Sequence, residues 1–323
     1  MPRIETPVTR LLGIRYPVIQ AGMSWASSSA ALPLAVSRAG GLGQIAAGPM
    51  RPAALSEAIR DVRAGTDHPF AVNMPLYRPG AEEILDLLAQ MRPPAIVASQ
   101  GGPDRYLHRF KDLGVICVHT VASVAHARKA AQAGVDALVV VGGEAGGHPP
   151  PDMVSTLVNL RAVARAVPEI PLIAAGGFAD GHGLAAALAL GAGAASFGTR
   201  FLATPEATVS DAYKARVLAG GVADTYVVGR DLGVIRALGN DFTRRMCAAE
   251  SQGATLEERR TIFRDATLKA AALEGDTDGG KLEAGQSAGL VDDLCPAGEL
   301  VAQIVSEYAR ARASLPEVTV GTL

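Results

Sequence analysis

The chain has 323 residues, of which 49% are hydrophobic and 19% charged, and its formal net charge is −2. This composition allows a large buried core and excludes the basic surface of a nucleic-acid-binding protein. Cys117, Cys247 and Cys295 form no CxxC or Cys/His cluster, so we expect neither disulfides nor a metal site. Because the sequence shows no signal peptide and no membrane-spanning apolar run, it predicts a soluble cytoplasmic protein whose partner is a small molecule. The oligomeric state stays open.

Eight short apolar runs alternate with helical stretches rich in Ala and Leu. The predicted strands are Tyr16–Gln20, Gly43–Ile45, Phe70–Asn73, Ala95–Ala98, Val115–Val118, Ala137–Val140, Pro171–Ala174 and Ala194–Phe197, with helices near 28–39, 52–63, 80–91, 103–113, 122–133, 155–166 and 180–190. Continuous apolar runs are typical of parallel strands that are buried on both faces. Eight such strands interleaved with helices favour a closed (β/α)8 TIM barrel. The alternative, a doubly wound open sheet, predicts a GxGxxG turn after the first strand, whereas residues 21–25 read AGMSW.

The pattern changes after the eighth strand. Residues 205–274 are charged, helical and poor in strand formers, which predicts a helical insertion. We expect this insertion either to close over the active site as a lid or to pack against the barrel as a solvated helical face. Residues 1–204 and 275–313 then form the barrel domain, with a final helix at about 297–313, and 314–323 form a tail without clear structure.

The active site of such a barrel is built from the loops at the carboxyl ends of the strands. The first strand leads into Gly22, and the third ends in Asn73, which either contacts a heterocycle or caps a turn. The seventh and eighth strands lead into Gly176-Gly177 and Gly198-Thr199, where Gly-rich turns aim backbone N–H groups at a phosphate or serve as ordinary turns. A phosphate site beside room for a flat ring predicts FMN. Arg200 either adds charge there or forms a structural ion pair.

The loop after the sixth strand, residues 142–151, contains four glycines and His148. Because imidazole titrates near neutral pH, His148 is a candidate for taking a proton from carbon or returning one. Glu144 either orients this loop through hydrogen bonds or is solvated. His119, at the end of the fifth strand, is expected to be a structural histidine.

The chain resembles the 2-nitropropane dioxygenase-like flavoproteins, which include nitronate monooxygenases, NADH:quinone reductases and enoyl-acyl carrier protein reductase II enzymes. The resemblance covers nearly the whole chain and is carried by residues 17–23, 39–43, 70–73, 144–148, 175–178, 198–201, 284–286 and 289–291. It implies an FMN-binding TIM barrel with His148 as catalytic residue. It also implies FMN contacts at Ala21, Gly22, Met23, Asn73, Gly146, Gly176, Gly177, Ser196, Gly198 and Thr199.

Three functions follow from this resemblance. The first is a nitronate monooxygenase that oxidises alkyl nitronates with O2, using His148 as base. The second is a flavin reductase or dehydrogenase that uses NADH or NADPH and acts on quinones or α,β-unsaturated acyl thioesters. The third is a barrel that binds FMN or another phosphate ligand with little turnover.

Four positions distinguish the members of this family. Val141 stands where nitronate monooxygenases usually carry a Gln, and Pro149 follows His148 where they tend to carry Arg. A Pro after the histidine resembles the quinone reductases, whose Lys at the end of the fifth strand appears here as Thr120. The late sequence Ala-Gly-Gln at 284–286 is similar to the acyl carrier protein reductases. The family is therefore predicted more sharply than the substrate.

Overall fold

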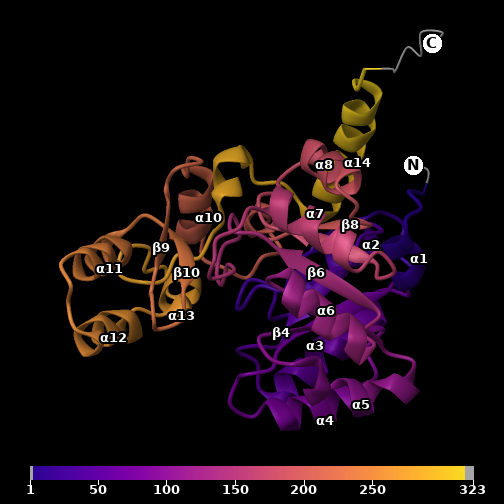
Figure 1. Ribbon diagram of the computed structural model, residues 1–323, viewed down its shortest axis with the longest axis horizontal. Coiled ribbons are helices and arrows are strands. Elements are labelled where there is room, and N and C mark those ends of the chain that lie inside the picture. The colour runs from indigo at the N-terminus through magenta and orange to yellow at the C-terminus, as the bar shows by residue number, and fades with distance from the viewer. Residues whose placement is uncertain (1–2, 317–323) are drawn as a thin grey trace.

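A parallel eight-stranded barrel forms the centre of the computed structural model, which describes residues 3–316 (Figure 1). The strands are β1 Val18–Gln20, β2 Gly43–Ala46, β3 Phe70–Pro75, β4 Ala95–Ser99, β5 Ile116–Val121, β6 Ala137–Val141, β7 Leu172–Ala175 and β8 Ala194–Phe197. They are ordered β1-β8-β7-β6-β5-β4-β3-β2, and a parallel bridge between Ile19 and Leu42 joins β1 to β2. The predicted TIM barrel is confirmed.

Helices surround the barrel between successive strands. They are α2 Ala31–Arg38, α3 Pro52–Gly65, α4 Ala81–Met91, α6 Val124–Ala133, α7 Thr156–Ala166, α8 Gly181–Ala189 and the predicted final helix α14 Ala297–Ala313. The predicted helix at 103–113 is wrong as a single helix: the segment divides into η1 Pro103–Arg105, α5 Leu107–Phe110 and η2 Lys111–Leu113. Tyr106 breaks it, because its φ of −131° is not helical. Within residues 3–316, no helix is both long and apolar enough to span a membrane.

A short helix that the sequence analysis did not predict, α1 Pro7–Leu12, closes the amino-terminal end of the barrel. Thr6 and Thr9 cap its first turn reciprocally, and Thr6 Oγ1 donates a 2.6 Å hydrogen bond to the carbonyl oxygen of Gly193. Val8 and Leu12 are buried in one apolar cluster with the inward-facing residues of the strands. The interior is therefore packed at this end, and α1 lies at the end of the molecule opposite the insertion (Figure 1).

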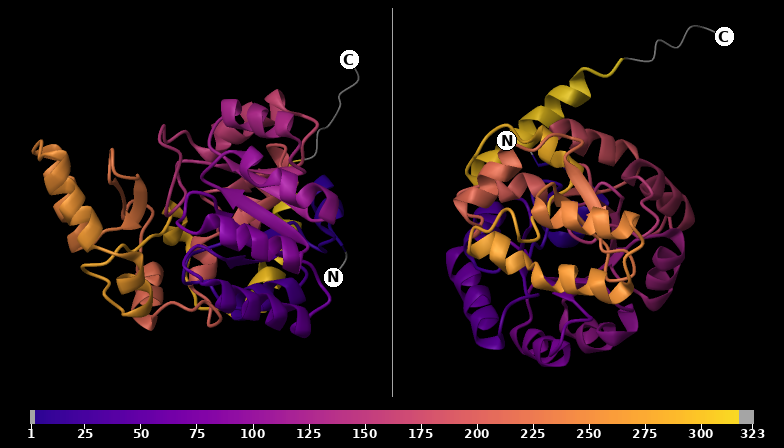
Figure 2. Two further views of the ribbon diagram at one scale, coloured as in Figure 1. Left: turned by 90° about the horizontal axis from the view of Figure 1, so that it is seen from below. Right: turned by 90° about the vertical axis from the view of Figure 1, so that its left-hand side faces the viewer.

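The short helix α9 Thr199–Leu202 follows β8 directly, and the insertion after it contains the helices α10 Asp211–Leu218, α11 Asp241–Ser251, α12 Leu256–Asp265 and α13 Leu268–Leu273. The segment is helical as predicted, and it also contains an antiparallel hairpin of β9 Thr225–Val228 and β10 Ile235–Leu238 that was not predicted. All four residues of β9 are β-branched or aromatic, which favours a pleated surface, whereas in β10 only Ile235 is of this kind. The insertion lies across one end of the ring of helices (Figure 2).

A small apolar core of its own stabilises the insertion. Val228 and Ile235 of the hairpin pack there against Phe242 and Met246 of α11, and all four side chains are buried. The 3-10 helix η3 Gln286–Leu290 then returns the chain to the barrel before α14. Residues 275–287 therefore run between the insertion and the barrel mouth.

Candidate active site

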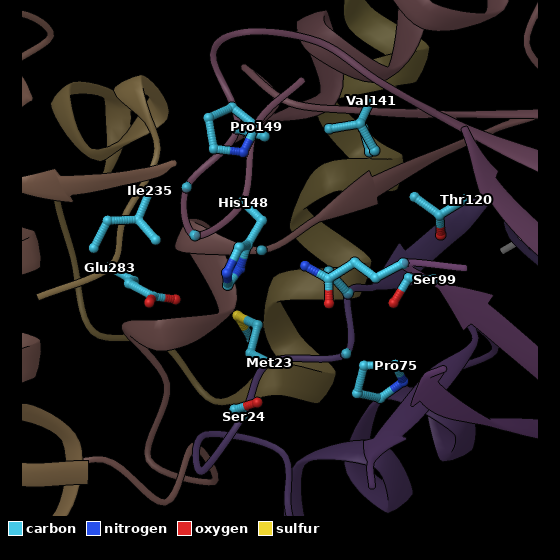
Figure 3. Close-up of a pocket in the computed structure, with 18 of the residues that line it drawn as sticks. Met23, Ser24, Pro75, Ser99, Thr120, Val141, His148, Pro149, Ile235 and Glu283 are labelled. Atoms are coloured by element: carbon cyan, nitrogen blue, oxygen red, sulfur yellow. The ribbon is translucent and has the colours of Figure 1, made fainter. Parts of the chain in front are cut away.

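A cavity of about 1480 Å³ opens at the carboxyl ends of the barrel strands, beneath the insertion. It is lined by every residue that the sequence analysis selected for cofactor binding or catalysis, namely Ala21, Gly22, Met23, Asn73, Gly146, His148, Gly176, Gly177, Ser196, Gly198 and Thr199. Figure 3 shows part of this lining, with His148 and Met23 pointing into the same space. The barrel topology brings these residues together because parallel strands end at one rim.

The two glycine loops after β7 and β8 leave open space against the cavity. Gly176 and Gly177 have φ angles of +101° and +84°, in the left-handed region that favours glycine. A Cβ atom on Gly177 would lie 3.5 Å from Glu144 Cβ, and one on Gly198 would lie 3.8 Å from Met23 Sδ. Gly177 and Gly198 therefore have room for a ligand to approach the backbone, whereas a Cβ atom on Gly176 would lie 2.9 Å from Thr156 Oγ1.

Arg200 does not line this cavity. Its Nη2 lies 2.5 Å from Asp293 Oδ1, and its Nη1 donates to the carbonyl oxygen of Asp293 at 3.1 Å. Of the two roles that the sequence allowed for Arg200, the structure shows the structural ion pair.

Polar amides from β2 and β3 form another part of the wall. Asn73 lies against Gly22, where a Cβ atom would be only 2.3 Å from Asn73 Cβ, and its Nδ2 donates a 3.2 Å hydrogen bond to Val97 O. Gln44 is buried, and its backbone N–H donates to Gln20 Oε1 at 2.9 Å. In the described part of the chain, Gln44 Oε1 accepts no hydrogen bond. Because buried polar atoms are nearly always hydrogen-bonded, this oxygen favours a ligand that carries a hydrogen-bond donor.

Glu144 anchors the loop that follows β6. Its Oε2 accepts hydrogen bonds from the backbone N–H of Thr156 at 2.9 Å and from Thr156 Oγ1 at 2.8 Å, at the start of α7. Gly142 is in direct contact with the same threonine, since a Cβ atom there would lie 1.9 Å from Thr156 Oγ1. Glu144 therefore orients the loop, which was one of the two roles left open by the sequence.

The insertion holds the other end of this loop. Gly147 and Arg236 of β10 exchange two backbone hydrogen bonds, at 3.1 and 2.7 Å. The Arg236 side chain is buried, and its Nε and Nη2 donate to the carbonyl oxygen of Gly143 at 3.1 and 2.6 Å. Burial lowers the pKa of Arg236, an effect that the Glu144 carboxylate opposes. His148 thus sits on a loop fixed at both ends.

Glu283 is a cavity residue that the sequence analysis missed. It pairs with Ala237 of β10 through an antiparallel bridge, and its carbonyl oxygen accepts a 2.6 Å hydrogen bond from the Tyr213 hydroxyl. A Cβ atom on Gly147 would lie 3.1 Å from Glu283 Oε2, so the carboxylate lies beside the residue that precedes His148 (Figure 3). Burial raises the pKa of Glu283, and the nearby His148 and Lys281 act in the opposite direction.

His119 forms a neutral part of the cavity wall. Its ring is stacked on Tyr106 with centroids 5.9 Å apart, and Tyr106 Oη lies 3.4 Å from His119 Nδ1. Burial lowers the pKa of His119 to about 4. It lines the cavity and also has the packed surroundings expected of a structural histidine.

Basic side chains outnumber acidic ones around the cavity. Arg78, Lys129, Arg264 and Lys281 line it, whereas the carboxylates are those of Glu144 and Glu283. Because Glu144 is already held by Thr156, the remaining charge favours an anionic ligand.

The sequence profile of the nitronate monooxygenase family matches residues 5–89 and 80–307. The chain belongs to this family. It is 36% identical to a (3aS,4S,5R,7aS)-5-hydroxy-7a-methyl-1-oxo-octahydro-1H-indene-4-carboxyl-CoA dehydrogenase of Mycobacterium tuberculosis, over 94% of this chain and 96% of the relative. It is 32% identical to a nitronate monooxygenase of Paraburkholderia phytofirmans, over 93% and 94% of the two chains.

Among solved structures, FabK from Thermotoga maritima superposes with a TM-score of 0.90 and 38% sequence identity, covering 96% of this chain and 98% of FabK. This member of the nitronate monooxygenase family is therefore similar along almost its whole length to proteins with different activities. Membership of this family identifies the protein as an oxidoreductase but does not identify its substrate.

Proposed function

We propose that the protein is an FMN-dependent oxidoreductase that acts on an acyl thioester of coenzyme A, with His148 as the catalytic base. The size and charge of the cavity carry this proposal. Its volume of about 1480 Å³ exceeds the roughly 300–1,000 Å³ of an ordinary small-molecule site. A cavity of this size with excess basic side chains suits two phosphate-bearing ligands, a cofactor and a substrate. The similarity to a carboxyl-CoA dehydrogenase supports the choice of substrate.

The residues present fit FMN. The open glycines after β7 and β8 suit the phosphate, because backbone N–H groups in such turns bind anions. Gln44 Oε1, a buried acceptor without a partner among the described residues, fits a ring N–H, and the nearby Asn73 amide lies on the same wall. When bound, FMN supplies two-electron redox chemistry that no side chain of the protein can supply.

The protein's own groups position the substrate and move its proton. The His148 ring is exposed to the cavity, where it takes a proton from the carbon next to the thioester carbonyl. Pro149 and Pro150 are buried and restrict the backbone at and after His148. Arg78 and Lys129, which line the same cavity, suit the phosphates of coenzyme A.

Oxidation of alkyl nitronates with O2 is the second candidate function. The similarity to a nitronate monooxygenase of Paraburkholderia phytofirmans favours it. His148 would act as base there only towards a neutral nitroalkane, because a nitronate has already lost that proton. Val141 lines the cavity and provides no hydrogen bond to a flavin ring. We therefore place this function second.

Anaerobic absorbance spectra of the purified protein test both candidates. The flavin is first released and identified, and the protein is then mixed in turn with butyryl-CoA, ethylnitronate, NADH and NADPH. Bleaching by butyryl-CoA, or bleaching by a nicotinamide followed by reoxidation with crotonyl-CoA, supports the proposal. Bleaching by ethylnitronate alone overturns it in favour of the second candidate, and protein without flavin overturns both.

A further inference from the structure

Two titratable side chains face the same part of the cavity and have no partner in the fold. Within residues 3–316, neither the His148 ring nor the Glu283 carboxylate forms a hydrogen bond or a salt bridge. Figure 3 shows the two side chains next to each other, with Met23 below them. Side chains left unpartnered beside a large cavity are available to a substrate.

The backbone fixes the separation of this pair. Arg236 and Ala237 are consecutive in β10; the first bridges to Gly147 and the second to Glu283. Leu238 N–H also donates to Leu282 O at 2.9 Å, so the strand of Glu283 continues the ladder. The carboxylate is thus held beside His148 by main-chain contacts that do not depend on either side chain.

Two basic side chains, His148 and Lys281, act electrostatically on the Glu283 carboxylate. The Lys281 ammonium lies 3.5 Å from the centroid of the Phe263 ring, and its charge acts to lower the pKa of Glu283. The Tyr213 hydroxyl donates to the Glu283 carbonyl oxygen, and Tyr77 faces Glu283 from the loop after β3. The group on this side of the cavity that can gain a positive charge during turnover is His148.

We propose that Glu283 is a specificity-determining residue that makes the His148 site favour a substrate that is neutral at its reacting group over one that is anionic there. The proposal rests on the assignment of His148 as base. When the substrate C–H bond breaks, the proton forms an N–H bond on the imidazole and the electron pair stays on the substrate. A carboxylate beside the resulting imidazolium stabilises it. The same carboxylate repels a substrate that is already an anion, such as a nitronate.

The pH dependence has a definite sign. Burial raises the pKa of Glu283, whereas His148 and Lys281 act to lower it. At a pH above this pKa, the Glu283 carboxylate is charged and repels an anion beside it. As the pH falls through the pKa of Glu283, the carboxylate is protonated and this repulsion is lost. The titratable groups that face Glu283 from neighbouring elements are His148, Lys281, Tyr77 and Tyr213.

The test compares nitroethane with its own anion, ethylnitronate, on the flavin-loaded protein and its Glu283→Gln variant. Gln keeps the shape of the side chain and removes the charge. We expect the ratio of kcat/KM for the nitronate to kcat/KM for the nitroalkane to rise roughly 10- to 100-fold, as removal of a like charge at short range implies. Lys281→Met is the opposite-charge control. It removes a positive charge near Glu283, so the nitronate-to-nitroalkane ratio of kcat/KM should fall in this variant.

A binding measurement that needs no turnover accompanies the kinetics. Nitrate, a planar monoanion, is titrated by calorimetry, and its Kd should become roughly tenfold lower in Glu283→Gln and higher in Lys281→Met. In the unmodified protein, nitrate binding should tighten as the pH falls through the pKa of Glu283, which tests the proposal even if a variant does not fold.

Unchanged substrate ratios and an unchanged nitrate Kd, in a Glu283→Gln protein that retains its Tm and flavin content, would overturn the proposal. A protein that lacks flavin but shows the expected nitrate affinities would refute the proposed function and leave the role of Glu283 standing. A protein that reacts with butyryl-CoA but shows no effect of Glu283→Gln would support the proposed function and refute the role of Glu283.

Discussion

The guanidinium of Arg236 donates two hydrogen bonds to the carbonyl oxygen of Gly143, from Nε at 3.1 Å and from Nη2 at 2.6 Å. This contact joins the hairpin of the insertion to the first residues after β6. Since the guanidinium and the carbonyl are both buried, the loss of either partner leaves an unsatisfied polar group in the protein interior.

We expect Arg236→Gln to lower the free energy of unfolding by about 1–3 kcal/mol, because Gly143 O loses its charged donor. Urea denaturation followed by circular dichroism measures this change. Thr225→Val is the matched control, since it removes only the single 2.9 Å bond between Arg236 Nη1 and Thr225 Oγ1 and should cost less. Equal stabilities of the two variants would contradict this role of Arg236.

His148→Ala should retain FMN and lower turnover by roughly two to four orders of magnitude, the usual contribution of a positioned acid or base. Stopped-flow measurement of flavin reduction by the substrate found in the anaerobic screen gives the rate. His182→Ala, an exposed histidine on α8, is the control and should react like the unmodified protein. Full activity of His148→Ala would show that the imidazole has only a structural role.

Gly177→Asp should abolish FMN binding, because the new carboxylate would enter the space proposed for the phosphate and repel it. Gly177→Ala is the matched control: its φ of +84° strains an alanine, but the added Cβ has 3.5 Å to its nearest neighbour. We therefore expect Gly177→Ala to bind FMN with reduced affinity. The absorbance of the purified proteins reports their flavin content, and full occupancy in Gly177→Asp would place the phosphate elsewhere.

His119 should make the protein less stable in acid. Burial lowers the pKa of His119 from 6.5 to about 4, so between these values the unfolded chain binds a proton that the folded protein does not. The free energy of unfolding therefore falls as the pH falls, by about 2 kcal/mol between pH 7 and pH 5 from this residue alone. His119→Phe keeps an aromatic ring for Tyr106 and should lose this part of the dependence, which urea denaturation at both pH values would measure.

The sequence was sufficient to predict the barrel and to place its functional loops at one end of it. The eight strands are short and mostly apolar, a pattern typical of parallel strands buried on both faces, and their carboxyl ends must meet at one rim. This is why Gly22, Asn73 and His148, chosen separately along the chain, line one cavity. Binding of FMN by these residues stays a prediction.

The features that were missed depend on contacts between distant segments. The hairpin has a strand pattern at Thr225–Val228 and Ile235–Leu238, with Gly229 and Gly233 between them, but the surrounding charged helices hid this pattern. Glu283 carries no pattern at all. It reaches His148 because one edge of β10 pairs with β9, while the opposite edge pairs both with Gly147 of the loop after β6 and with the returning chain at residues 282–283. Such pairings are determined by tertiary packing, and the strand propensities of the residues do not predict them.

One strand of the insertion, β10, sets the distance between the two groups proposed to handle the substrate's proton, while the glycine loops proposed to hold the cofactor belong to the barrel itself. Substitutions in β10 can therefore alter which molecules react while leaving the glycine loops after β7 and β8 in place. A graft meant to transfer this selectivity to another barrel of the family would have to include residues 205–287, because Glu283 lies beyond the insertion itself.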